Sequence, residues 1–198
     1  MPTPNRTTND EIVAAARSLL DEGGLDALTM QAVATRVGVR APSLYKRVQN
    51  REQLVGLVVE SSVLELAETL DAAAGVTADD PVDSLVALAR ALRAFAHRYP
   101  NRFGLVFGSS SRAVRPSEDA LAASSAAVLR VSERLAGADY ALEAARTVTA
   151  WALGFLTMEL SGSFQLGGDP AKAFGYGAMA IARAIDAASD FSRMRPST

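Results

Sequence analysis

Cysteine is absent from the 198-residue chain, and histidine and tryptophan occur once each. The lack of cysteine excludes disulfides, thiolate metal sites and cysteine nucleophiles, and it is typical of proteins from a reducing compartment. The sequence also has no glycine-rich phosphate loop, and its acidic residues show no metal-ligand spacing. We therefore expect a protein that is not an enzyme and that holds no metal and no cofactor.

Long uncharged apolar runs are missing as well. No stretch of about 18 apolar residues occurs, which is the length that a membrane-spanning helix requires. The first ten residues, MPTPNRTTND, contain no apolar region of the secretory-signal type. Hydrophobic residues nevertheless make up 49% of the chain, which is enough for a sizeable buried core. We expect a soluble cytoplasmic protein with no membrane partner.

Positive charge is in slight deficit overall, with a net charge of −2, but it is unevenly distributed. Residues 1–51 hold seven basic and five acidic residues, so the remainder of the chain is the acidic part. The stretch from Thr29 to Arg51 contains five basic residues and no acidic one. Only this stretch has the charge that attracts phosphates, although a solvated basic face would explain the charge alone equally well.

Apolar residues recur at spacings of three and four, and no alternating β-type run stands out, which predicts an all-α fold of about nine helices. Gly23 and Gly24 are expected to end the first helix, Thr29 to cap the second, and Pro42 to occupy the first turn of the third. The expected helices span residues 9–22 and 29–37, a short segment from Ala41, and residues 51–73, 80–99, 102–107, 117–135, 140–160 and 170–188.

The stretch 29–54, TMQAVATRVGVRAPSLYKRVQNREQL, has the pattern of two short helices joined by a tight turn. Gly38 permits a left-handed turn, and Val39 fills the corner between the helices. The residues expected on the inner faces are Ala32, Val33, Val37, Leu44 and Val48. The residues expected on the outer face are Arg40, Pro42, Ser43, Lys46 and Arg47, which are small or basic.

Small and basic side chains on a short rigid helix suit entry into the major groove of double-stranded DNA. The ring of Tyr45 can lie along the sugar-phosphate backbone, and Arg51 with the free N–H groups of its helix can hold a phosphate. Arg40, Pro42 and Ser43 are the candidates for base edges. The predicted DNA-binding set is Thr29, Arg40, Ala41, Pro42, Ser43, Tyr45, Lys46 and Arg51.

This region resembles the DNA-binding domain of the tetracycline-repressor-type (TetR) family of bacterial regulators. The resemblance covers roughly residues 9–56, and Val48 and Arg51 stand where the family usually has an aromatic residue and lysine. It implies a transcriptional regulator that binds a palindromic DNA operator as a homodimer. The matching residues are Ile12, Ala15, Ala16, Gly23 or Gly24, Leu28, Thr29, Val33, Ala34, Val37, Gly38, Val39, Leu44, Tyr45, Arg51, Glu52, Gln53 and Leu54.

The C-terminal half has a weaker resemblance, carried by residues 95–108 and 148–164, to a TetR subgroup named after a Trp-His-Gly pattern. Leu153 stands in place of the histidine. The expected domains are residues 1–55, a three-helix helix-turn-helix domain, and residues 56–198, an antiparallel helical domain. The family implies that this second domain binds an effector and forms the dimer.

Aromatic residues and a flexible methionine concentrate in the C-terminal half, where they suit either a pocket for an apolar or aromatic effector or an ordinary core. His97 is more typical of a helix C-cap than of a ligand. Arg93, Arg146 and Glu159 are candidate polar groups in a pocket or simple surface charges. The predicted pocket residues are Phe95, Phe103, Phe107, Trp151, Phe155 and Met158.

The last two long helices carry apolar stripes that two copies of the chain can join into a four-helix interface. The same stripes would also serve as internal core. The predicted interface residues are Leu142, Ala145, Thr149, Ala152, Leu156, Phe174, Gly177, Ala178, Ile181 and Ile185.

The sequence as a whole favours a ligand-responsive repressor that an unknown small molecule releases from its operator. A constitutive or architectural DNA-binding protein without an effector is the alternative. A helical carrier of apolar ligands would explain a pocket, but it would leave the acid-free basic segment unexplained.

Overall fold

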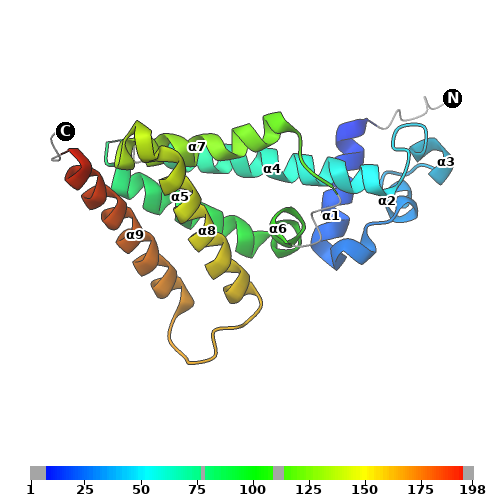
Figure 1. Cartoon of the computed structure of the whole chain (residues 1–198). Coiled ribbons are helices and arrows are strands. Elements are labelled where there is room, and N and C mark those ends of the chain that lie inside the picture. The colour runs from blue at the N-terminus through cyan, green and yellow to red at the C-terminus, as the bar shows by residue number, and fades with distance from the viewer. Residues whose placement is uncertain (1–7, 77–78, 109–113, 194–198) are drawn as a thin grey trace. The chain divides into compact units, whose positions relative to one another are not determined.

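The computed structural model describes residues 8–76, 79–108 and 114–193. Within these ranges it contains nine α-helices, one short 3-10 helix and no strand, which confirms the predicted all-α class (Figure 1). None of the described helices is both long and apolar enough to cross a membrane. The elements are α1 Asn9–Ala27, α2 Met30–Arg36, α3 Ala41–Leu44, α4 Arg51–Val76, α5 Pro81–Arg98, α6 Pro100–Phe107, α7 Glu118–Ala136, the 3-10 helix Ala138–Tyr140, α8 Ala141–Leu160 and α9 Pro170–Arg193.

Several helix ends differ from those expected. Gly24 takes a left-handed backbone with φ 70°, but it produces a kink rather than an end, and α1 continues to Ala27. The helical backbone is thus interrupted at the predicted glycine pair, and a short helical segment that counts as part of α1 follows it. Helices α4 and α9 also run further than predicted, to Val76 and Arg193. A glycine can adopt a left-handed conformation anywhere, so its position alone does not decide between a kink and a terminus.

The helices form two compact units. Unit 1 contains residues 1–64 and 99–120, and unit 2 contains residues 65–98 and 121–198. Helix α6 thus belongs with the N-terminal helices, although the sequence placed it in the second domain. The functional boundary expected at residue 55 stays a prediction, because compactness does not say what each part does.

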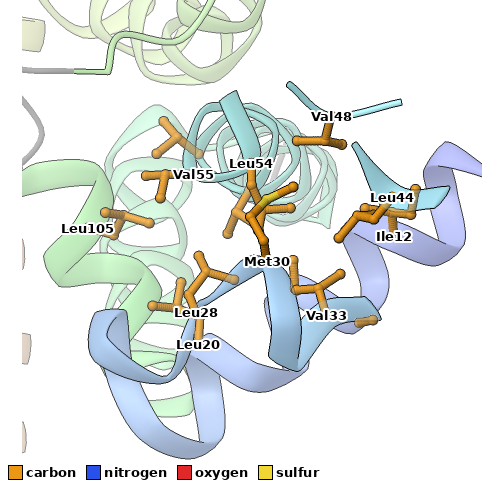
Figure 2. Close-up of a cluster of buried hydrophobic side chains, with 14 of the residues drawn as sticks. Ile12, Leu20, Leu28, Met30, Val33, Leu44, Val48, Leu54, Val55 and Leu105 are labelled. Carbon is orange, nitrogen blue, oxygen red and sulfur yellow. The ribbon is translucent and has the colours of Figure 1, made fainter. Parts of the chain in front are cut away.

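The core of unit 1 is built from branched aliphatic side chains (Figure 2). Leu20 and Leu28 from α1 and its C-terminal cap meet Val33 of α2 and Leu54 of α4, and each has no exposed surface. Leu105 of α6 joins the same cluster. The short helices therefore gain their stability from this shared core, since isolated helices of their length are marginal in water.

The core of unit 2 is aromatic where α8 meets α9, which run side by side in opposite directions (Figure 1). The Trp151 ring stacks on Phe174 with centroids 4.9 Å apart, and Phe155 meets Phe174 edge-on at 5.2 Å. Gly177 is required here because a Cβ at that position would collide with the Trp151 ring. Gly177, a predicted interface residue, therefore makes a close contact inside its own chain.

Candidate nucleic-acid interface

Helices α2 and α3 form a rigid pair with a defined turn. The Thr29 hydroxyl caps α2 by accepting a hydrogen bond from the Ala32 amide at 3.1 Å. Gly38 follows α2 with φ 72°, a left-handed conformation that favours glycine. Leu44 and Val48 are each 1% exposed and fix α3 to the core. The helix-turn-helix frame predicted from the sequence is therefore present.

The outer face of this pair carries most of the predicted DNA-binding residues. Tyr45 is 50% exposed, so this large aromatic side chain lies partly on the surface. Ala41 is half-buried under this face. No acidic residue lies between Thr29 and Arg51, so nothing on this segment repels a phosphate. The predicted residues that the structure exposes here are Thr29, Arg40, Pro42, Ser43, Tyr45 and Lys46.

Arg36 contributes less to the basic face than its charge suggests. Its guanidinium donates two hydrogen bonds to the Glu22 carboxylate, at 2.9 and 2.7 Å, and a third to the Ser18 hydroxyl. Arg36 and Ser18 together lower the pKa of Glu22 to about 2, so the carboxylate is charged at neutral pH. One of the five basic charges in the segment is therefore offset by a residue of α1.

Arg51, a predicted phosphate ligand, is also engaged within the chain. Its Nε donates to the Leu28 carbonyl at 2.8 Å and its Nη2 to the Leu25 carbonyl at 2.5 Å. These bonds cap the C-terminal end of α1 and join it to the start of α4, a use of arginine that satisfies helix-end carbonyls. A phosphate contact by Arg51 stays a prediction, and Arg40, Lys46 and Arg47 carry most of the outward charge.

Three hydrogen bonds that were not predicted from the sequence hold the start of α4 and Arg47 in place. Asn50 accepts a hydrogen bond from the Gln53 amide at 2.8 Å, and the Gln53 side chain accepts one from the Gln49 amide at 2.6 Å. Arg47 donates to the Asn9 side chain at 3.4 Å. The spacing of Asn50 and Gln53 matches a reciprocal helix cap, which is a signal that was available in the sequence.

Helix α6 is fixed to α1 by a charged contact across 81 residues of sequence. Arg102, only 4% exposed, donates to both carboxylate oxygens of Asp21, at 2.8 and 2.6 Å. Asn101 donates to the Leu20 carbonyl at 3.0 Å, and Arg102 also lies 3.5 Å from the ring centroid of Tyr99. No local sequence pattern predicts an ion pair between residues this far apart in the chain. It makes α6 part of the same rigid unit as the helix-turn-helix.

The six predicted effector-pocket residues do not gather in one unit. Phe103 and Phe107 contact one another on α6 in unit 1, with ring centroids 5.0 Å apart. In unit 2, Trp151 and Phe155 lie 6.0 Å apart, Phe95 is 5% exposed, and Met158 is 47% exposed. Trp151 and Phe155 thus serve the α8–α9 core. The set as a ligand pocket stays a prediction.

The predicted dimer residues divide into a buried and an accessible group. Leu142 is 46% exposed, Thr149, Gly177, Ile181 and Ile185 are half-buried, and the others are covered by their own chain. Covered side chains cannot contact a second copy directly, so these positions belong to the core of unit 2. The covered residues are Ala145, Ala152, Leu156, Phe174 and Ala178.

Comparison with known proteins finds a family match for both the N-terminal and the C-terminal part of the chain. Residues 12–58 match the family model described as bacterial regulatory proteins, tetR family, and residues 85–181 match the one described as tetracyclin repressor-like, C-terminal domain. The chain belongs to the TetR family. Members of this family are DNA-binding transcriptional regulators and not enzymes. Neither match tests the Trp-His-Gly subgroup, which stays a prediction.

Individual relatives agree with this TetR assignment. The HTH-type transcriptional regulator Rv1816 of Mycobacterium tuberculosis is 36% identical over 94 residues, which cover 47% of this chain but only 40% of that protein. Among solved structures, BioQ of Mycobacterium smegmatis matches with a TM-score of 0.67 and 25% identity over 92% of this chain and 99% of its own. A TetR variant from Acinetobacter baumannii AYE in complex with minocycline has a TM-score of 0.67 and 24% identity, covering 97% of this chain and 100% of that one.

Proposed function

We propose that this TetR-family chain is a ligand-responsive repressor in the cytoplasm that binds a palindromic operator as a homodimer. The observation that carries this proposal is the exposed, acid-free face formed by the turn after α2 and by α3. It joins Arg40, Tyr45 and Lys46 on a frame held by buried Leu44 and Val48. A short helix held at a fixed angle with small and basic residues outward suits the major groove of DNA.

The residues of this face divide by chemistry into two roles. Tyr45 and Lys46 are assigned to phosphates, because a hydroxyl and a flexible ammonium position a protein on DNA without reading its sequence. Pro42 and Ser43, with Arg40 at the start of α3, are assigned to base edges. Arginine pairs with guanine through two hydrogen bonds, and such a pair discriminates against a wrong base by about 1–3 kcal/mol.

Recovery of bound genomic fragments by the purified chain, followed by footprinting, tests the operator. A short palindromic footprint is expected, with half-sites about one DNA turn apart. Extended coating would support the architectural alternative instead. No bound fragment at low salt would contradict DNA binding altogether.

Single substitutions test the phosphate contacts assigned to Lys46 and Tyr45. Lys46→Ala should weaken binding to every sequence and lower the slope of log affinity against log salt by about one. Tyr45→Ala should weaken binding similarly. Arg36→Ala is the matched control, since its charge is held by Glu22 and its loss should leave the slope unchanged. Equal slopes for wild type and Lys46→Ala would remove Lys46 from the interface.

The homodimer is assigned to the exposed side of α8 and α9 in place of the buried stripe. Single exposed apolar residues are ordinary on a surface, but small and apolar residues are exposed along the length of both helices, and we take them together as the proposed face. Tyr176 is 79% exposed and Met158 47%. The exposed residues of this face are Leu142, Ala150, Gly154, Met158, Tyr176, Ala180, Ala184 and Ala187.

Sedimentation of the chain tests the dimer. Wild type should sediment at twice the 20.8 kDa of one chain at micromolar concentration. Ala180→Glu places a charge in the proposed face and should shift the protein toward monomer. Ala123→Glu, on the exposed side of α7, is the matched control and should stay dimeric. A monomeric wild type would refute this assembly.

The effector is assigned to unit 2. A solved TetR variant with a similar fold is in complex with minocycline, which supports a small-molecule effector for this chain. In this scheme the effector favours a dimer whose two α3 helices no longer match successive grooves. DNA must then weaken effector binding by the same factor, because coupling between two sites is reciprocal. A small-molecule screen against the recovered operator that releases nothing would favour a constitutive regulator.

A further inference from the structure

Unit 2 has a solvent-open surface cavity of about 490 Å³ between α5 and the first turns of α9. Helices α5 and α9 pack directly against one another, so both walls of the cavity come from one unit. Its volume lies in the range of small-molecule sites in proteins. Arg93, one of the polar groups suggested from the sequence for a pocket, lines it, but none of the six predicted aromatic and methionine pocket residues does.

Three cationic side chains line this cavity. Arg90 and Arg93 come from α5, and Lys172 comes from α9. Arg90 and Lys172 are exposed and make no hydrogen bond or ion pair within the described part of the chain. Two helices thus bring unpaired positive charges to one cavity. Because like charges repel, this arrangement favours an anion between them.

Arg93 is held in a fixed orientation by its own partner. Its Nε donates to Glu159 Oε2 at 3.0 Å and its Nη2 to Oε1 at 2.5 Å, while His97 Nε2 lies 3.2 Å from Oε2. Glu159 offsets the charge of Arg93, and the carboxylate of Asp169 also acts on it. A guanidinium has five N–H donors and Glu159 uses two, so Arg93 keeps donors for a ligand.

The rest of the cavity wall is apolar and mostly small. Ala94 of α5 and Ala171 of α9 line it together with Phe174, whose ring stacks on Trp151. Gly175 leaves additional room, since a Cβ at that position would have no neighbour within 4 Å. An inorganic anion has no apolar part that could contact this wall.

We propose that this cavity binds a small organic carboxylate, with its acid group held by Arg90, Arg93 and Lys172 and its apolar body against Ala94, Ala171 and Gly175. Carboxylates accept charge-assisted hydrogen bonds from arginine and lysine, which are stronger than bonds between neutral groups. The proposal deepens the function proposed above and rests on it for its regulatory meaning: the effector is an organic acid. Binding of the acid itself does not depend on that function.

Titration of the full-length chain without DNA tests the site directly. The probes are 4-phenylbutyrate, the corresponding amide and inorganic phosphate, followed by calorimetry and by the fluorescence of the single tryptophan. Trp151 reports on the cavity because it stacks on Phe174. The acid should bind with saturation and change the fluorescence. The amide and phosphate should each bind at least about tenfold more weakly, for lack of the charge and of the apolar body.

A double variant identifies the cations. Arg90→Gln with Lys172→Gln should weaken binding of the acid about tenfold or more, because two charge-assisted contacts are removed without touching the Arg93–Glu159 pair. Arg183→Gln removes one exposed charge from the same helix outside the cavity and is the control. Equal affinity for acid and amide, or equal binding by double variant and control, would overturn the proposal.

Operator binding is measured separately, with the same proteins and probes. Loss of DNA binding by the wild type without any probe would contradict the proposed function and leave the carboxylate site standing. Binding of the acid that is lost in the double variant supports the site. Release of operator by the acid from wild type, but not from the double variant, would add support for its regulatory meaning.

Discussion

The two units differ in what holds their helices together. Unit 1 has an aliphatic core of leucine, valine and isoleucine, and its charged contacts at Arg36, Arg51 and Arg102 tie short helices and helix ends. Unit 2 has longer helices, an aromatic cluster at α8 and α9, and one buried carboxylate, Glu159. Four-residue α3 is too short to be stable by itself, so it depends on the buried side chains of Leu44 and Val48, while the arginine contacts join the helices around it.

The largest loss of stability is expected from a substitution in the aromatic core of unit 2. Phe174→Ala should lower the free energy of unfolding by about 3–5 kcal/mol, because it opens a cavity between Trp151 and Phe155. Urea denaturation followed by circular dichroism measures it. Leu166→Ala, an apolar residue with a fully exposed side chain in the same unit, should change stability by no more than about 0.5 kcal/mol. Similar losses for both variants would show that the aromatic cluster adds nothing specific.

The polar contacts of unit 1 are tested by removing Arg102. Arg102→Met leaves the Asp21 carboxylate without its main partner and should cost about 2–3 kcal/mol, less than for a fully buried pair because 27% of the Asp21 side chain is exposed. A double-mutant cycle with Asp21→Asn measures the coupling in chemical denaturation. Strictly additive single losses would mean that Arg102 stabilises α6 through packing alone.

The buried carboxylate of unit 2 should respond to pH differently from the exposed one of unit 1. Hydrogen bonds from Arg93 hold the pKa of Glu159 below its ordinary value of 4.5. A depressed folded-state pKa stabilises the fold above that value, and the contribution is lost as the pH falls through the folded pKa. Glu159→Gln should therefore cost about 2 kcal/mol at pH 7, with a smaller difference from wild type below pH 4.5.

Glu22→Gln in unit 1 is the variant to compare with Glu159→Gln in unit 2. Arg36 lowers the pKa of Glu22 to about 2, so its contribution is also lost between pH 4.5 and 2. The Glu22 side chain is 57% exposed, against 7% for Glu159, so solvent screens its pair and the loss should be the smaller of the two. Stability curves against pH for both variants check this order, and an equal or larger effect at Glu22 would reverse the comparison.

Local patterns were enough to predict the helix-turn-helix. Thr29, Gly38, Leu44 and Val48 act within about twenty residues of one another, and each role follows from its immediate neighbours in sequence. The same reasoning left Arg51 among the phosphate ligands, because its contacts with carbonyls at the end of α1 depend on how the chain folds back.

Contacts between distant segments set the limit of sequence reasoning in unit 2. The apolar stripes of α8 and α9 suit either an interface or an internal core, and the structure buries Phe174 and Leu156 within their own chain. Periodicity identifies an apolar side of a helix, but it does not say which helix covers it. Arg93 and Glu159 are separated by 66 residues, and only the packing of α5 on α8 brings them together.

The smallest expected effects compare two glycines, one in each unit. Gly38→Ala places a Cβ on a left-handed residue with φ 72° and should cost about 1–2 kcal/mol, even though no atom lies within 4 Å of that Cβ. Gly175→Ala, inside helix α9 with equally open surroundings, should stabilise the chain by about 0.5–1 kcal/mol through helix propensity. Thermal unfolding of both variants measures whether stability falls for Gly38→Ala and rises for Gly175→Ala. If Gly38→Ala leaves the stability unchanged, the turn between α2 and α3 tolerates a side chain. The polar contacts of Arg36 and Arg51, rather than the glycine backbone, would then define the geometry of the outer face of this helix pair.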